Sequence, residues 1–468
     1  MGVLAMLFTP YGNRVFVTSA LQSSVLAFIY TFSLYTPLFT AAGLSEADVV
    51  HMSVAVQAGL GLLQIPNLFI AHMIEKRYGQ QITDKILSVL GSTLMTLSCL
   101  AIGLLLIGEP PINAQSLICF AFLLGGGAGM TYVHLTTVIS TIMASKGGDI
   151  MRSAIAQLSL WFGVGAILFA ILAEFWWIPQ IGVANSFFIM ACVYCAVGTL
   201  CVITVVRDGS NNDNDDDKEK IAGDIEQEQD GTSSSEQHDV LDSTPNSTHD
   251  NGKEKDCSKS LCSWFCQLTT NIIFILNSIV AGFGIGISGT YLAFLGYLPN
   301  QFNSAFGKRG TFWLAFLFLV GQTLARLITA ILYAKSKSPY MMAMWVLSLT
   351  VGMAVLSFYS QGANGYAVLI SCTIMISLGF GGLQSSWFVV AATTYPMNCP
   401  KMLSFAYTYL FVFIFTFVTG LFSTALQRVE HLTTFSHNTC FVQLVCFFAM
   451  SCVLLVLSLG MGRRIAKQ

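Results

Sequence analysis

Charge is scarce in this sequence, and it is scarcer still inside the apolar segments. Only 10% of the 468 residues are Asp, Glu, Lys or Arg, whereas 54% are hydrophobic, and the mean hydropathy is +0.68. A soluble domain of this length could not bury so much apolar surface. The sequence therefore predicts a polytopic helical membrane protein, and its 40 Gly and 35 Phe fit helices packed closely against one another and against lipid.

Sequence patterns typical of enzymes are also missing. The chain has no Gly-rich phosphate loop ending in Gly-Lys-Ser or Gly-Lys-Thr, no His-Glu-X-X-His pattern and no paired carboxylates within an apolar segment. Its 13 Cys form no disulfide framework, and its 7 His are too scattered to predict a metal site from their spacing. We therefore expect no enzymatic activity, no cofactor, no metal and no nucleic-acid partner.

Twelve apolar runs are long enough to cross a bilayer, for which a helix needs about 20 residues. They cover residues 15–40, 49–72, 86–107, 116–143, 153–173, 184–206, 268–296, 311–334, 340–359, 366–394, 403–426 and 440–459. An even number of crossings puts both termini on the same side of the membrane. The sequence does not indicate which cellular membrane holds the protein.

The distribution of basic residues predicts that both termini are cytosolic, because cytosolic loops are enriched in Lys and Arg. On that orientation the outer segments hold only Lys308, Arg309 and Arg428. The short inner segments hold Arg14, Lys76, Arg77, Lys85, Lys146, Arg152, Arg207, Lys335, Lys337, Lys401, Arg463, Arg464 and Lys467.

The chain divides into two apolar halves around an acidic segment. Between Arg207 and Ser260 lie 16 acidic and 6 basic residues, which leaves 24 − 16 = 8 acidic and 22 − 6 = 16 basic residues elsewhere. We predict an N-terminal six-helix bundle (1–206), an acidic disordered cytosolic linker (207–262) and a C-terminal six-helix bundle (263–468). The Gly-rich stretches at 125–129 and 379–382 occupy corresponding places in the two halves. The predicted fold is therefore all-α, with 12 transmembrane helices in two pseudo-symmetric bundles around a midplane site.

Arg326 is the one charged residue in the central part of any apolar run. A charge at this depth costs about 2.5–3.5 kcal/mol on insertion scales, so it is rare and usually faces a pathway or a partner. The carboxylates Glu46, Glu109 and Glu174 all lie at the outer edges of runs, where they cannot neutralise it. We infer that a substrate anion completes the site. A structural arginine capped by backbone carbonyl groups is the alternative.

Polar residues recur at helical spacing along several runs, and they are the further candidates for substrate binding. Such faces can instead join one helix to another. His134 can relay a proton near neutral pH, but without a carboxylate in the membrane the sequence does not require proton coupling, and facilitated diffusion is equally allowed. The predicted substrate-binding residues are Arg326, His134, Tyr30, Gln22, Thr131, Asn277, Gln384 and Trp387.

The layout of six runs, a central loop and six runs resembles the major facilitator superfamily over nearly the whole chain. Ala71 to Gln80 (Ala-His-Met-Ile-Glu-Lys-Arg-Tyr-Gly-Gln) is loosely similar to the family's loop pattern Gly-X-X-X-Asp-(Arg/Lys)-X-Gly-(Arg/Lys)-(Arg/Lys), with Ala for Gly, Glu for Asp and one extra residue. The resemblance implies a gating role for Glu75, Lys76, Arg77 and Gly79.

The eighth run looks like that of the monocarboxylate-transporter and nodulin-like branch, through Ala325-Arg326-Leu327 and Ala330-Ile331-Leu332. Residues 125–132 and 378–381 are similar to nodulin-like fourth and tenth spans. The resemblance implies that Arg326 contacts a substrate carboxylate. The eleventh run has no base where some dicarboxylate relatives carry Lys, which favours a monocarboxylate.

We therefore expect a secondary active or facilitative transporter of a small organic anion that works by alternating access in the lipid bilayer, with protons as an allowed co-substrate. An amino-acid transporter of the same fold is the first alternative, because Arg326 can hold an amino acid's carboxylate equally well. The second is a transporter-like receptor or sensor that signals through the acidic loop.

Overall fold

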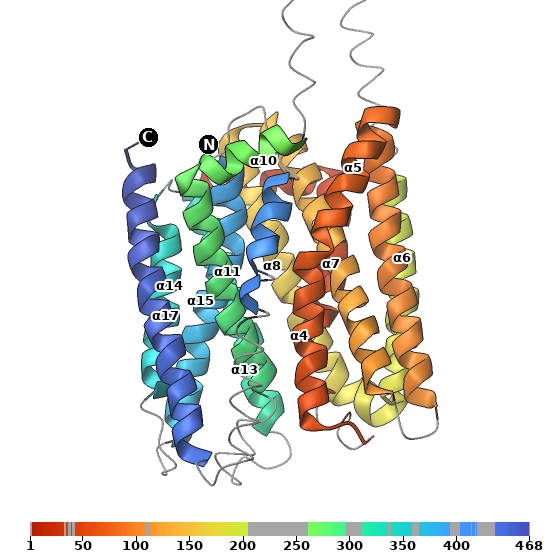
Figure 1. The fold of residues 1–468 in the computed structure, drawn as a ribbon. Helices are drawn as coiled ribbons and strands as arrows, with labels where there is room; N and C mark the ends of the chain where they lie inside the picture. Colours follow the sequence, from red (N-terminus) through yellow and green to blue (C-terminus); the bar gives the residue numbers. More distant parts are fainter. Residues whose placement is uncertain are drawn as a thin grey trace, which may run out of the picture.

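The protein is built from long α-helices that run side by side (Figure 1). This computed structural model describes residues 2–31, 34–35, 39, 43–108, 113–204, 261–295, 310–335, 338–357, 365–393, 403–412, 414–416, 418 and 436–467. Over these ranges every regular element is helical. The predicted all-α fold class is confirmed.

The first half of the chain supplies the helices on one side of the molecule. They are α1 (Val3–Phe8), η1 (Thr9–Gly12), α2 (Arg14–Leu26), η2 (Ala27–Thr31), α4 (Glu46–Leu62), α5 (Gln64–Tyr78), α6 (Gln80–Ile107), α7 (Ala114–Ala144), α8 (Gly148–Leu172), the π-helical η3 (Ala173–Ile181) and the helix Val183–Thr204.

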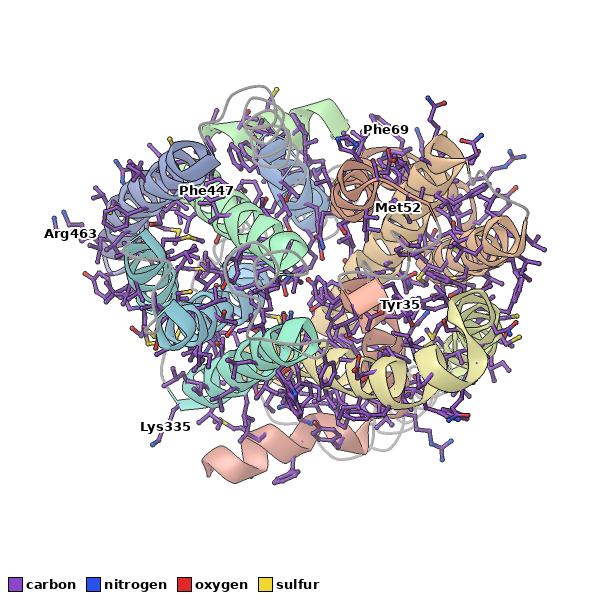
Figure 2. The ribbon with its side chains drawn as sticks, turned by 90° about the horizontal axis from the view of Figure 1, so that it is seen from below. Tyr35, Met52, Phe69, Lys335, Phe447 and Arg463 are labelled. Atoms are coloured by element: carbon purple, nitrogen blue, oxygen red, sulfur yellow. The ribbon has the colours of Figure 1, made fainter. Side chains whose placement is uncertain are left out.

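The second half supplies most of the helices on the other side, and the N-terminal helix α1 of the first half also packs against this side (Figures 1 and 2). They are α10 (Leu261–Thr270), α11 (Ile272–Phe294), α13 (Gly310–Lys335), α14 (Met341–Ser357), α15 (Gly365–Thr393), the helix Leu403–Thr416 and α17 (Ser436–Ile465). Where the two halves meet, α8 packs against α13 and α15.

Each of the twelve predicted runs coincides with helix over its described part. Within the described ranges, nine helices are long and apolar enough to cross a membrane, and Met341–Leu356 and Leu403–Thr416 are shorter apolar helices. The N- and C-termini lie at the same end of the molecule in Figure 1, as an even number of crossings requires. Residues 205–260, which include most of the predicted linker, lie outside the described part.

Two predicted runs are interrupted. The run 49–72 divides at Leu63 into α4 and α5, because Pro66 in the first turn of α5 has no N–H with which to continue the ladder. The run 268–296 begins later than predicted. The Asn271 side chain accepts hydrogen bonds from the backbone N–H groups of Ile273 (3.1 Å) and Phe274 (3.2 Å) and so starts α11. Residues before Asn271 form the separate helix α10, which lies across the end of the bundle in Figure 1.

Glycines let the helices approach closely. A Cβ added at Gly125 of α7 would lie 1.9 Å from the Val56 carbonyl oxygen of α4. The Gly-rich stretch of the fourth run therefore lies at a close contact between α7 and α4. A Cβ at Gly381 of α15 would lie 2.0 Å from the Gln322 carbonyl oxygen of α13. The close contact of α15 with α13 places Gln384 beside Arg326, one turn further along α15.

Candidate functional site

Arg326 lies fully buried in the middle of the molecule, with 1% of its surface exposed. It projects from α13, and its guanidinium stands over the Phe162 ring of α8, with Cζ 5.2 Å from the ring centroid. Nη1 donates a hydrogen bond to the Ser159 carbonyl oxygen at 3.0 Å. Nη2 donates to Gln322 Oε1 at 3.1 Å and also to Gln384 Oε1.

All the hydrogen-bond partners of Arg326 are electrically neutral. Its Nε makes no hydrogen bond, and no carboxylate of the described residues pairs with the guanidinium. A buried charge without a counter-ion is unfavourable even when its N–H groups are largely satisfied. The Ser159 carbonyl group provides one cap of the kind that a structural arginine would use, but it does not balance the charge. The site therefore holds an uncompensated positive charge.

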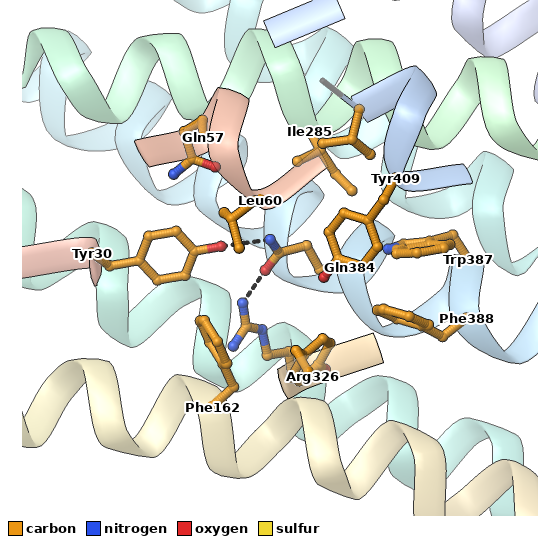
Figure 3. A pocket seen from close by; sticks show the side chains of 12 residues that line it. Tyr30, Gln57, Leu60, Phe162, Ile285, Arg326, Gln384, Trp387, Phe388 and Tyr409 are labelled. Atoms are coloured by element: carbon orange, nitrogen blue, oxygen red, sulfur yellow. Dashed lines mark hydrogen bonds between the residues drawn. The ribbon is translucent and has the colours of Figure 1, made fainter. Parts of the chain in front are cut away.

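A chain of hydrogen bonds through Gln384 connects the two halves of the protein. Gln384 accepts from Arg326 and donates through Nε2 to the Tyr30 hydroxyl at 2.6 Å (Figure 3). Tyr30 belongs to η2 in the first half, whereas Gln384 and Arg326 belong to the second. Ser385 Oγ also donates to Ser159 Oγ across the same boundary, at 3.0 Å. A movement between the halves must rearrange these bonds.

A narrow cavity adjoins this network. Its volume is about 30 Å³, which is room for about two water molecules and too little for an organic substrate. Apart from Arg326 no lining side chain is charged, and aromatic rings form much of the wall. The lining residues are Tyr30, Gln57, Leu60, Tyr132, Phe162, Ile285, Arg326, Gln384, Trp387, Phe388, Tyr409 and Val412 (Figure 3).

Four of the eight predicted substrate-binding residues line this cavity: Arg326, Tyr30, Gln384 and Trp387. Their contact with a substrate stays a prediction. Helices from both halves bring them together, because Tyr30 comes from the first run, Arg326 from the eighth, and Gln384 and Trp387 from the tenth.

The other four lie outside the cavity because they bond elsewhere. Gln22 donates to Ser92 Oγ of α6 at 3.1 Å, and Thr131 donates to the Gly127 carbonyl oxygen of its own helix at 2.9 Å. Asn277 donates to the Trp387 backbone oxygen at 3.4 Å, so it lies behind the cavity wall. His134 faces α6. For Gln22 the alternative role of joining one helix to another therefore describes the contact that the structure contains.

Sequence reasoning missed several lining residues. Phe162 and Tyr132 pack edge to face, with ring centroids 5.4 Å apart, and Tyr132 meets Phe388 of the other half at 5.2 Å. An aromatic residue in an apolar run carries no signal that separates a cavity wall from a lipid-facing or packed position. Tyr132 could have been found only through its place next to Thr131 in the polar stripe.

A carboxylate beside His134 was missed as well. The predicted apolar run begins at residue 86, but α6 begins at Gln80 and includes Asp84. Asp84 Oδ1 lies 3.7 Å from His134 Nδ1, and the Asp84 side chain is 20% exposed. The candidate span Ile82–Ile107, defined by length and composition, therefore includes a carboxylate that the apolar run 86–107 leaves out.

The predicted gating segment is mostly helical. Glu75, Lys76 and Arg77 form the exposed last turn of α5, where the two bases face the negative end of the helix dipole. Gly79 joins α5 to α6 with φ at +81°, a conformation that favours glycine. The gating role of these residues stays a prediction.

A second, larger cavity of about 430 Å³ lies between α5, α10 and the helix Leu403–Thr416. No charged residue lines it, and its walls are apolar apart from the Cys266 thiol and the Tyr407 hydroxyl. It offers nothing that would select an anion, whereas the Arg326 cavity does.

A many-helix membrane fold with a buried charge between its two halves is an arrangement typical of membrane transporters. The chain belongs to the Major Facilitator Superfamily, whose model matches residues 151–420. It is therefore a transmembrane transporter that works by alternating access on a small-molecule substrate, and not an enzyme. No curated protein matches the chain.

Solved structures share the fold at low sequence identity. The nucleoside transporter NupG matches with a TM-score of 0.57 and 12% identity over 95% of this chain and 99% of that one. The proton:xylose symporter XylE matches with a TM-score of 0.60 and 13% identity over 94% of each chain. FucP in the outward conformation matches with a TM-score of 0.60 and 11% identity over 96% and 99%. These likenesses support the fold and leave the substrate open.

Proposed function

We propose that the protein transports a small organic anion, such as a monocarboxylate, through the cavity beside Arg326. The observation that carries this proposal is the uncompensated positive charge of Arg326, which is buried among neutral partners. Buried ionisable groups in membrane proteins commonly mark substrate pathways. A bound carboxylate supplies the missing counter-charge.

Gln384 marks where the carboxylate binds. Its amide oxygen accepts from Arg326, and its nitrogen holds the Tyr30 hydroxyl oxygen (Figure 3). A guanidinium is a planar fork that suits a carboxylate better than a single amide oxygen. When the cavity opens, the substrate displaces the Gln384 oxygen and accepts from Nη2, from the unpartnered Nε, or from both. Displacement also frees the Gln384–Tyr30 bond between the halves, so binding loosens one of their connections.

The proposal includes the finer assignment to the monocarboxylate-transporter and nodulin-like branch. It is supported by the sequence around Arg326 and by the absence of Lys and Arg from the described part of 403–418. We further propose two rigid bundles, 1–206 and 263–468, joined by the linker 207–262, with both termini in the cytosol. A substrate amino acid would need an acceptor for its ammonium group, and no Asp or Glu lines the cavity.

Counterflow in proteoliposomes tests the proposal. Purified protein is loaded with unlabelled pyruvate, lactate, a dicarboxylate or an amino acid, and the uptake of the labelled compound is measured. We expect a monocarboxylate to exchange, and we expect Arg326→Ala and Arg326→Lys to lose that exchange. Lys335→Ala is the matched control, because it removes a positive charge from the exposed end of the same helix.

Wild-type exchange in both Arg326 variants would refute the site. Exchange of amino acids alone would favour the first alternative. No exchange of any compound, together with a cellular response that is lost on deletion of residues 211–255, would favour the sensor.

A further inference from the structure

His134 and Asp84 form a pair between α7 and α6, outside the cavity that contains Arg326. His134 is 1% exposed, and its Nδ1 lies 3.7 Å from Asp84 Oδ1, within the range of an ion pair but too far for a hydrogen bond. Its other nitrogen, Nε2, is buried and has no hydrogen-bond partner. Asp84 reaches solvent with 20% of its side chain. The imidazole is therefore sealed from water except on the side of Asp84.

The pair of a neutral His134 and an ionised Asp84 has one negative charge, which a single proton can neutralise. Glu75, in the last turn of α5, is close enough for its carboxylate to repel that of Asp84. Of the two charges on α8, Arg152 pairs with Asp149. The remaining acidic, basic and histidine residues on the helices α2, α4, α5 and α6 around the pair are Arg14, Glu46, Asp48, His51, His72, Lys76, Arg77 and Lys85.

We propose that His134 and Asp84 bind the proton that moves with the substrate anion. This inference rests on the proposed anion transport and adds the site at which the co-transported proton binds. The proton arrives from water at the exposed Asp84 carboxylate and is held between Asp84 Oδ1 and His134 Nδ1. The pair changes from a net charge of −1 to 0, and no other bond forms or breaks.

The contacts of α7 link this proton site to the anion site. Tyr132 lies two residues before His134 on α7 and lines the Arg326 cavity. Its ring meets Phe388 of α15 at 5.2 Å, and Phe388 lies one turn beyond Gln384. Protonation draws the pair from 3.7 Å toward hydrogen-bond distance and so pulls α7 toward α6. That movement shifts Tyr132 against the helix that carries Gln384.

The charges explain why the two ions move together. The empty transporter holds an uncompensated positive charge at Arg326 and an uncompensated negative charge at Asp84. An anion cancels the first and a proton cancels the second. Both sites are neutral only when the transporter has bound the anion and the proton together. The charges are therefore consistent with the transport of one proton with each monovalent anion.

Two measurements test the inference. The first is an infrared pH titration of the purified protein in lipid vesicles, without substrate, which follows the carboxylic-acid and imidazole bands. We expect one coupled titration that is lost in both Asp84→Asn and His134→Gln and kept in His72→Gln, the matched control on the exposed surface of α5. Because no anion is added, this result does not depend on the proposed substrate.

The second measurement uses pyruvate in proteoliposomes with acid outside. One proton per anion sustains about tenfold accumulation for a gradient of about one pH unit. We expect Asp84→Asn and His134→Gln to abolish this accumulation while pyruvate counterflow at equal pH persists, because exchange moves no net proton. Persistent counterflow also shows that the variants are folded.

Gradient-driven accumulation in either variant would overturn the inference, as would an unchanged infrared titration. A variant that loses both counterflow and accumulation would also overturn the inference, because the pair would then be needed for the transport of the anion itself. If the wild type fails to exchange pyruvate, the proposed substrate fails, and the infrared titration still decides the proton site.

Discussion

The substitution Gln384→Glu separates a substrate-binding Arg326 from a structural one. It keeps the shape of the side chain but replaces the neutral amide oxygen beside Arg326 with a carboxylate. The new group still accepts from Arg326. Gln384 Nε2 donates to the Tyr30 oxygen, whereas the carboxylate would accept from the Tyr30 hydroxyl. The variant therefore builds an internal copy of the anion that we propose as the substrate.

The expected changes in stability and transport have opposite signs. Arg326 is already charged, so its bond to the neutral Gln384 oxygen contributes about 1.5–3 kcal/mol. Gln384→Glu makes the acceptor charged as well and supplies the missing counter-charge, so we expect it to stabilise the protein by about 1–2 kcal/mol. A substrate must then displace this stronger bond, and it meets a guanidinium that already has its counter-charge. Together these effects cost about 3–4 kcal/mol of binding free energy, or about a hundred- to a thousandfold in affinity.

Thermal unfolding in detergent and pyruvate counterflow measure the two effects on the same preparation. We expect a melting temperature a few degrees higher and counterflow near background. Gln267→Glu adds the same charge on the exposed face of α10 and should change neither. If Gln384→Glu is stabilised and still exchanges pyruvate like the wild type, Arg326 is a structural residue and the proposed site is wrong.

Three further predictions concern the surroundings of the site. Gly381→Ala places a methyl group 2.0 Å from the Gln322 carbonyl oxygen. We expect the free energy of unfolding to fall by about 1–3 kcal/mol, which a lower melting temperature would show. The control is Gly460→Ala, where a Cβ meets nothing within 4 Å, and it should leave the melting temperature unchanged. Tyr30→Phe removes the 2.6 Å hydrogen bond to Gln384, which contributes about 1 kcal/mol. We expect the substrate concentration that gives half-maximal counterflow to change by about fivefold, and an unchanged concentration would contradict the role of this bond. Deletion of residues 211–255 should leave counterflow unchanged, and its loss would show that the linker takes part in transport.

The sequence alone was sufficient for the helical membrane fold, because the signal is local. Each crossing needs an unbroken apolar run, and that requirement can be checked without knowing the neighbours of the helix. The family follows from the same pattern. Arg326 was identifiable for a similar reason, since a charge among apolar residues stands out wherever the helix packs.

Membership of the cavity could be predicted only in part, because it depends on the rotation and partners of each helix. Gln22, Thr131 and Gln384 are all polar residues at helical spacing, yet only Gln384 reaches Arg326, since the close approach at Gly381 sets α15 against α13. Phe162 carries no polar signal, and its place over Arg326 depends on the contact of α8 with α13.

The pair of His134 and Asp84 shows most clearly what the tertiary structure decides. The residues are 50 positions apart in the sequence, and Asp84 precedes the apolar run, so hydropathy assigns it to a loop. Extension of α6 back to Gln80 and its packing against α7 bring the carboxylate to 3.7 Å from the imidazole. The sequence by itself determined that a charge lies within the membrane. The packing of the helices decided which groups surround Arg326 and which other polar groups lie together. Hydropathy indicates that a segment is buried in lipid or protein, but it does not indicate which residues a side chain contacts.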